Sequence, residues 1–201
     1  MKNNFIIIVT LFCFLQTITG QKCEATLYFK DGTVLKGYGK LKINGVVKFR
    51  KTLDEKPKKH DFVVLEKMET TINEDSKVFV QVKVKNKEKL EILDLEIKGK
   101  LNLYIKINQG YNHNFSGNFE QGGMSIPTGV NFYSIQNYYV KRKDENQAFH
   151  LGSNQAFSKN FKKAASLYFS DCPELVNKIE NKVYKKKDLK RIIKFYNENC
   201  I

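Results

Sequence analysis

Strict alternation of apolar and polar residues marks two segments near the middle of the chain. They are KVFVQVKVK (Lys77–Lys85), in which every second residue from Val78 to Val84 is valine, and LNLYIKI (Leu101–Ile107). A period of two places one face of a strand against a core and the other in water, as in an antiparallel sheet. Leu90–Ile97 is a third strand candidate between them. These three segments predict an antiparallel sheet at the centre of the fold.

Two dipeptides upstream of this region predict β-hairpins. Asp31-Gly32 and Asn44-Gly45 each separate two strand-like segments within residues 25–51. Such dipeptides favour two-residue hairpin turns, because both central positions of these turns need positive φ. A two-residue turn at Asp31-Gly32 pairs Phe29 with Val34 and Tyr28 with Leu35 across the strands. We therefore expect a β-meander near the N-terminus of the mature protein.

Other stretches are less regular. Residues 52–61, TLDEKPKKHD, predict a loop, and Phe62–Leu65 predicts a short strand. Residues 108–131 are rich in Gly, Asn and aromatic residues and predict a long irregular loop. A structureless stretch of this length is uncommon in a compact domain, so it is either a mobile surface loop, which we favour, or a functional loop. Phe132–Arg142 and Ala148–Leu151 then predict a hairpin.

Beyond Gly152 the apolar spacing changes from two to 3.6 residues, which is the period of an amphipathic helix. Three helices are expected, at about residues 154–169, from about Asp171, and at about Lys187–Asn199. Asp171 is a plausible N-cap for the second helix, with Pro173 in the first turn and Glu174 completing a capping box.

The helix positions also predict a disulfide. Cys172 falls in the first turn of the second helix, and a helical wheel turns Cys200 toward the buried side of the third. Antiparallel packing of these two helices brings the cysteines together, so we predict a Cys172–Cys200 bridge. Cys23 is the remaining cysteine of the mature chain, and Cys23–Cys172 and Cys23–Cys200 are the alternative pairings.

The N-terminus reads as a secretory signal peptide, with Lys2, an apolar run over Phe5–Leu15 and cleavage expected after Gly20. The alternative, an uncleaved membrane anchor, would require a longer apolar run. Cleavage removes one lysine and no acid from a formal charge of +14, which leaves +13. We expect an exported protein in an oxidising compartment, periplasmic or at the cell surface, where a basic protein meets anionic lipid and polysaccharide.

No catalytic, cofactor-binding or metal-binding motif stands out in the sequence. His60, His113 and His150 are not spaced as metal ligands. The clearest site candidate is a basic run in the last helix, whose members are Lys187, Lys190, Arg191 and Lys194. It is either the solvated face of a terminal helix or a contact surface for anionic lipid or polysaccharide, and nucleic acid is a weaker possibility because exposed aromatic residues do not alternate with the charges.

The C-terminal third carries a resemblance to a known group. The segments that carry it are Asn137–Val140, Leu151–Ser153, Phe161–Ala165, Tyr168–Val176 and Tyr196–Cys200. They resemble small, uncharacterised exported proteins of Bacteroidetes, of the flavobacterial type. The resemblance implies a Gram-negative envelope protein and assigns no activity to any residue.

The expected protein is α+β: an antiparallel, curved or barrel-like sheet of about seven to nine strands, followed by a C-terminal three-helix segment. Residues 1–20 are the signal peptide, 21–152 the β-rich domain with the loop 108–131, and 153–201 the helical segment packed on the same domain. The expected function is non-enzymatic binding or structural association at the envelope. The alternative is an envelope hydrolase with its site under the loop 108–131, where His113 and Glu120 are the only candidates.

Overall fold

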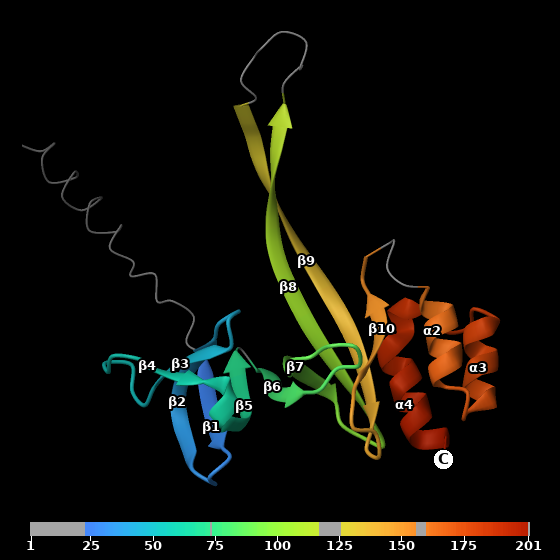
Figure 1. Cartoon of the computed structure of the whole chain (residues 1–201), viewed down its shortest axis with the longest axis horizontal. Helices are drawn as coiled ribbons and strands as arrows, with labels where there is room; N and C mark the ends of the chain where they lie inside the picture. Colours follow the sequence, from blue (N-terminus) through green and yellow to red (C-terminus); the bar gives the residue numbers. More distant parts are fainter. Residues whose placement is uncertain (1–22, 73, 117–125, 156–159, 201) are drawn as a thin grey trace, which may run out of the picture.

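The computed structural model describes residues 23–72, 74–116, 126–155 and 160–200. In this part of the chain a ten-stranded antiparallel sheet is followed by three α-helices, which confirms the α+β prediction (Figure 1). The strands are β1 (Glu24–Phe29), β2 (Val34–Leu41), β3 (Val46–Arg50), β4 (Lys58–Asp61), β5 (Leu65–Ile72), β6 (Asp75–Val82), β7 (Glu91–Ile97), β8 (Leu101–Ser116), β9 (Ile126–Arg142) and β10 (Phe149–Ser153). The helices are α2 (Phe161–Tyr168), α3 (Pro173–Glu180) and α4 (Leu189–Asn199), with short 3-10 helices η1 (Phe62–Val64) and η3 (Lys186–Asp188).

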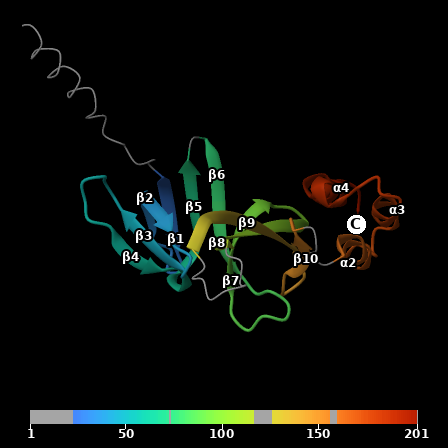
Figure 2. The ribbon, with the colours of Figure 1, turned by 90° about the horizontal axis from the view of Figure 1, so that it is seen from above.

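The sheet is open, with the strand order β10-β9-β8-β7-β6-β5-β1-β2-β3-β4. One half of it nevertheless curls strongly. Val84, two residues after β6, forms an isolated bridge with Ala148, which lies directly before β10. Two backbone hydrogen bonds support this bridge, from Lys85 N to Ala148 O at 2.9 Å and from Ala148 N to Lys83 O at 2.8 Å. Strands β6–β10 therefore bend around on themselves, while β1–β4 extend away from them (Figure 2).

Three clusters of buried side chains fill this architecture. The first lies between the helices and β8–β10, and includes Leu101, Leu103 and Val140 with the apolar faces of α2, α3 and α4. The second lies on β1–β5 and η1, around Leu27 and Phe62. The third lies inside the curl of β6–β10. Its buried members are Val82, Val84, Leu93, Tyr104, Tyr139 and Ala148.

The curl explains where the alternation of apolar and polar residues predicted the buried face of a strand correctly and where it did not. The valine face of the first segment lies inside the curl, where Val82 and Val84 are 7% and 1% exposed. In the alternating segment Leu101–Ile107, Tyr104 falls on the face that the period of two assigns to water, yet it is 5% exposed. Helices cover one face of β8 and the curl covers the other, so both faces are buried at the start of the strand.

Both N-terminal hairpins form, but with longer turns than predicted. Phe29 N donates to Thr33 O at 2.8 Å, and Tyr28 pairs with Val34 rather than with Leu35. The loop has three residues and ends in Gly32 at φ +87°, and the loop that ends in Gly45, at φ +81°, is built the same way. A three-residue loop of this kind needs only one residue at positive φ. The predicted register was therefore wrong by one residue.

The irregular loop predicted over residues 108–131 is mostly a hairpin. β8 and β9 pair continuously, with a single irregularity, from Leu101 opposite Arg142 to Ser116 opposite Ile126. The register of β8 with β7 ends at Ile105, and that of β9 with β10 ends at Asn137. Beyond these points the hairpin projects from the body as a two-stranded arm (Figure 1). Residues 117–125 of the predicted loop lie outside the described part of the chain.

Two smaller predictions are also corrected. The polar stretch 52–61 ends in strand β4, which pairs with β3. Its residue His60 lies edge-on to the rings of Phe29 and Phe49, with centroid distances of 5.5 and 6.3 Å. Phe62–Val64 forms the 3-10 helix η1 rather than a strand, and β5 starts at Leu65.

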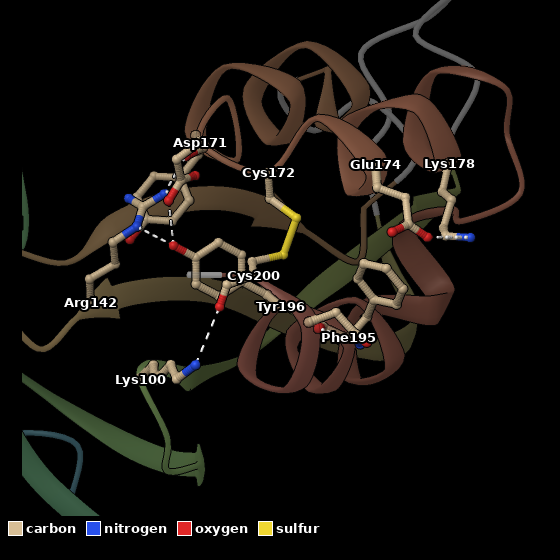
Figure 3. Close-up of a disulfide and its surroundings, with 11 residues drawn as sticks. Lys100, Arg142, Asp171, Cys172, Glu174, Lys178, Phe195, Tyr196 and Cys200 are labelled. Carbon is tan, nitrogen blue, oxygen red and sulfur yellow. Dashed lines mark hydrogen bonds and ion pairs between the residues drawn. A yellow bond between two sulfur atoms is a disulfide. The ribbon is translucent and has the colours of Figure 1, made fainter.

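The helical segment is close to the prediction. α2 begins at Phe161, later than the predicted start near residue 154, and part of the difference, residues 156–159, lies outside the described chain. Cys172 and Cys200 are bonded, with an S–S distance of 2.06 Å and a Cα–Cα distance of 5.6 Å (Figure 3). The predicted disulfide is thereby confirmed in the structure, and Cys23 is a free thiol.

The predicted N-cap of the second helix was wrong. Cys172 occupies the N-cap of α3 without a side-chain hydrogen bond, and Glu174 pairs with Lys178 instead of closing a capping box. Asp171 is turned toward the sheet, where its carboxylate accepts hydrogen bonds from Arg142 Nη2, at 2.7 Å, and from the hydroxyl of Tyr196 (Figure 3).

Arg142 is the centre of this junction between sheet and helices. Its guanidinium donates to Tyr196 Oη at 2.8 Å, to Glu145 Oε1 at 2.9 Å and to the backbone oxygen of Tyr168 at 2.7 Å. It also lies 4.2 Å from the ring centroid of Tyr168. Burial and the hydrogen bond to Glu145 raise the pKa of the Tyr168 hydroxyl. Because each of these donor groups already has a hydrogen-bond partner, we assign the cluster a structural role: it holds the helices against the sheet.

Candidate functional site

A groove lies between the sheet and the start of α4, and we call it the basic groove. It encloses about 350 Å³ and is lined by residues of β6–β9, η3 and α4. Its walls carry five cations and three acids, above an apolar floor. The lining residues are Lys77, Asp94, Glu96, Leu103, Ile105, Ile107, Gln136, Tyr138, Lys186, Lys187, Asp188, Leu189, Lys190 and Arg191.

The floor of the basic groove is the apolar row of β8 where it emerges from beneath the helices. Leu101 and Leu103 are 0% and 1% exposed, because the helical cap covers them. Ile105 is half-buried, and Ile107, the next residue of the row, is 43% exposed. On the neighbouring strand the hydroxyl of Tyr138 donates to Gln136 Oε1 at 3.2 Å. The groove therefore opens where the helical cap ends.

Asp94 is a buried carboxylate in the wall of the groove. It is 8% exposed, and its closest cation is Lys77 on β6, with 3.4 Å between Nζ and Oδ2. Burial raises the pKa of Asp94, because desolvation disfavours the charged form, and Lys77 offsets this only in part. Glu96 lies two residues further along β7 and pairs with Lys190, so an ion pair links the sheet to α4 across the groove.

The cations of α4 are exposed; Lys190 pairs closely with Glu96, whereas Arg191 and Lys194 have only distant carboxylate partners. The side chains of Lys190, Arg191 and Lys194 are 67%, 74% and 74% exposed. Arg191 lies 3.8 Å from Asp188, and Lys194 lies 3.9 Å from Glu198. Exposed pairs of this kind contribute about 0–1 kcal/mol and are screened by salt. Arg191 and Lys194 therefore lose little when they turn to an anionic ligand.

The structure brings the four predicted site residues together, with Lys187 in η3, which precedes α4, and Lys190, Arg191 and Lys194 on α4 itself. Lys187, Lys190 and Arg191 line the basic groove. Lys194 lies just outside it and lines a second, shallower hollow of about 460 Å³ together with Lys98, Lys190 and Arg191. Lys187 forms no ion pair with any described residue.

Sequence reasoning missed the sheet side of the groove. Lys77, Asp94, Gln136 and Tyr138 come from three different strands, and no local pattern connects them. One signal was present: Asp94 interrupts the apolar run Ile92–Leu95, and a carboxylate within such a run marks a buried charge.

The alternative hydrolase site predicted under the loop 108–131 falls largely outside the described residues. His113 belongs to β8, opposite Val130, and Glu120 lies outside the described residues. The ring of His150 lies 4.9 Å from that of Tyr139, and His60 flanks the second cluster. Among the described residues, no group of three or more His, Cys, Asp or Glu side chains is placed to hold a metal ion.

Comparison with protein-family models, with curated proteins and with solved structures gave no match for this chain. The resemblance to exported Bacteroidetes proteins thus stays a prediction, as does the signal peptide, whose residues 1–20 lie outside the described chain. Over the described residues, no helix has the length and apolar character needed to cross a membrane.

Proposed function

We propose that this chain is a non-enzymatic binding module of a Gram-negative envelope, which attaches to anionic lipid or polysaccharide through the basic side of η3 and α4. One observation carries the proposal: Lys187, Lys190, Arg191 and Lys194 lie together at the edge of a groove, and none is held in a tight buried pair. Three of them are more than two-thirds exposed.

The location follows from several independent expectations. The signal peptide predicted over residues 1–20 and the resemblance to flavobacterial exported proteins both favour an extracytoplasmic protein. The Cys172–Cys200 bond is compatible with it, because such bonds persist in oxidising compartments. In this proposal the curled, barrel-like half of the sheet, β6–β10, supports the helices that carry the basic residues.

The test is co-sedimentation of the mature protein with vesicles of phosphatidylcholine and phosphatidylglycerol and with envelope polysaccharide at rising salt. We expect binding to weaken as salt passes through the screening range. The triple variant Lys187→Glu/Arg191→Glu/Lys194→Glu should abolish it. A control with the same charge change, Lys36→Glu/Lys48→Glu/Lys59→Glu on β2–β4, should retain most of it. Equal loss in both variants, or binding that ignores salt, would contradict the proposal.

The alternative is a hydrolase, and one observation now favours the basic groove as its site instead of the loop 108–131. Asp94, with its raised pKa, lies beside Glu96 in the groove, and glycoside hydrolases use carboxyl pairs. Release of reducing ends from envelope polysaccharide, lost in Asp94→Asn, would support this alternative. Each carboxylate has a lysine partner, Lys77 or Lys190, so we rank it second.

A further inference from the structure

We propose that the basic groove binds a stretch of acidic polysaccharide, a chain of sugars that carry carboxylates, in preference to a lipid headgroup. The inference rests on the proposed function and names its ligand. It starts from the shape of the site, because the cations surround a hollow of about 350 Å³ rather than a flat face. That volume lies in the range of about 300–1,000 Å³ typical of small-ligand pockets.

The floor and the walls of the groove match different parts of a sugar. Ile105 and Ile107 offer apolar surface to the C–H faces of a sugar ring, and Ile107 is 43% exposed without cover from any described helix. The amide of Gln136 and the phenol of Tyr138 can exchange hydrogen bonds with hydroxyl groups. A membrane surface would leave this floor empty, since a flat array of headgroups contacts only the rim.

The charges of the groove fit a sugar acid better than a polyphosphate. Its five cations exceed its three acids, which leaves a surplus of two positive charges for carboxylates. Asp94 and Glu96 would repel a densely charged phosphate backbone, but they can accept hydrogen bonds from sugar hydroxyls. Nucleic acid would also need a row of stacking aromatic residues, and among the described residues that line the groove Tyr138 is the only aromatic one.

The proposal is tested by isothermal titration of the mature protein with a short oligogalacturonate and with its methyl ester, which has the same rings without the charges. We expect binding of the acid and at least about tenfold weaker binding of the ester. Equal binding of acid and ester would overturn the proposal.

Two matched variants separate the groove from net charge. Ile107→Glu places a negative charge on the floor of the groove, and Val34→Glu places the same charge on the distant strand β2. Both residues are strand positions of similar exposure, 43% and 47%. We expect Ile107→Glu to weaken oligogalacturonate binding about tenfold or more, because like charges then meet at close range, and Val34→Glu to change it less than about twofold. Equal effects would overturn the proposal.

Phosphatidylglycerol vesicles distinguish this inference from the function on which it rests. A protein that binds vesicles at low salt but not oligogalacturonate disproves the saccharide groove and leaves the proposed function standing. A protein that binds neither vesicles nor polysaccharide disproves both.

Discussion

At the scale of single residues, Asn197 joins the last helix to the sheet through a side-chain amide. Leu101 N donates to Asn197 Oδ1 at 2.7 Å, and Asn197 Nδ2 donates to Leu101 O at 3.0 Å. Gly99, in the turn before β8, leaves room for this amide, since a Cβ there would lie 2.4 Å from Nδ2. Two residues far apart in sequence therefore depend on each other.

We expect Gly99→Ala and Asn197→Ala each to lower the free energy of unfolding by about 1–3 kcal/mol, because each leaves the buried backbone groups of Leu101 without their partner. The double variant should lose clearly less than the sum, since both changes break the same contact. Urea unfolding followed by circular dichroism measures the cycle. Asn199→Ala, an exposed amide on the same helix, is the control, and additive losses would contradict the coupling.

A second residue-scale prediction concerns the pH dependence of stability. Burial raises the pKa of Asp94 in the folded state, so the folded protein binds this proton more tightly than the unfolded chain does. The resulting contribution to folding stability is complete below the usual pKa of 3.8. It is lost as pH rises through the raised pKa. Asp94→Asn should thus be more stable than the wild type at pH 7, on the order of 1 kcal/mol, and the gain should shrink toward pH 4.

Glu69 provides the opposite case for comparison. Hydrogen bonds from Lys67, at 2.6 Å, and from Tyr28, at 2.9 Å, lower its pKa. Its contribution is present at neutral pH and is lost as pH falls through the lowered value. Glu69→Gln should therefore lose stability at pH 7, with a smaller difference in acid. Thermal unfolding of Asp94→Asn and Glu69→Gln at several pH values tests these opposite pH dependences. If the stability difference from the wild type varied with pH in the same way for both variants, the prediction would be wrong.

At the scale of elements, the disulfide ties the N-cap of α3 to the C-cap of α4. Its sequence separation of 28 residues corresponds to about 3.6 kcal/mol in the chain-entropy description. We expect Cys172→Ser/Cys200→Ser to lower the free energy of unfolding by about that amount. Cys23→Ser should have little effect, because Cys23 is a free thiol. Urea midpoints measure both, and a non-reducing peptide map that links Cys23 to Cys172 would disprove the assignment.

The accuracy of sequence prediction also varied by element, for physical reasons. The stripes of α3 and α4 were predictable because helix periodicity is local, and Leu189, Ile192, Ile193 and Tyr196 are all buried. The hairpin registers were not, because an Asx-Gly dipeptide serves turns of two and of three residues. The arm was missed because Gly and Asn dilute the strand signal of residues 108–116.

The site was predictable only in part. Four of its five cations lie on η3 and the start of α4, where the sequence places them close together, whereas its floor depends on where the helices stop covering β8. That boundary is a tertiary feature, like the pairing of β1 with β5 and the bridge between Val84 and Ala148. Such contacts follow from the packing of both faces of the sheet and have no local sequence pattern.

At the scale of the whole molecule, the body and the arm should be separable. Neither β7 nor β10 continues along the arm, so the described residues of the arm add no lateral pairing to the body. We expect a variant with residues 110–133 replaced by Asn-Gly, which joins the paired residues Gln109 and Ser134, to unfold at an unchanged urea midpoint.

The disulfide-reduced protein is the positive control for this measurement, because its midpoint should fall. A fall of similar size in the shortened variant would show that the arm stabilises the body. Retained oligogalacturonate binding in the same variant would show that the groove works without the arm.

The Asn197 amide also decides where the helical cap can dock. Apolar side chains tolerate sliding of a helix over a sheet, since their contacts have no direction. A pair of hydrogen bonds to one buried residue does not tolerate such sliding. A shift by one helical turn would leave both the N–H and the C=O of Leu101, which is 0% exposed, without a hydrogen-bond partner. α4 can therefore dock on the sheet in only one position. The uncharged side chain of Asn197, about two turns after Lys190, thereby also sets the distance between Lys190 and its partner Glu96 on the sheet.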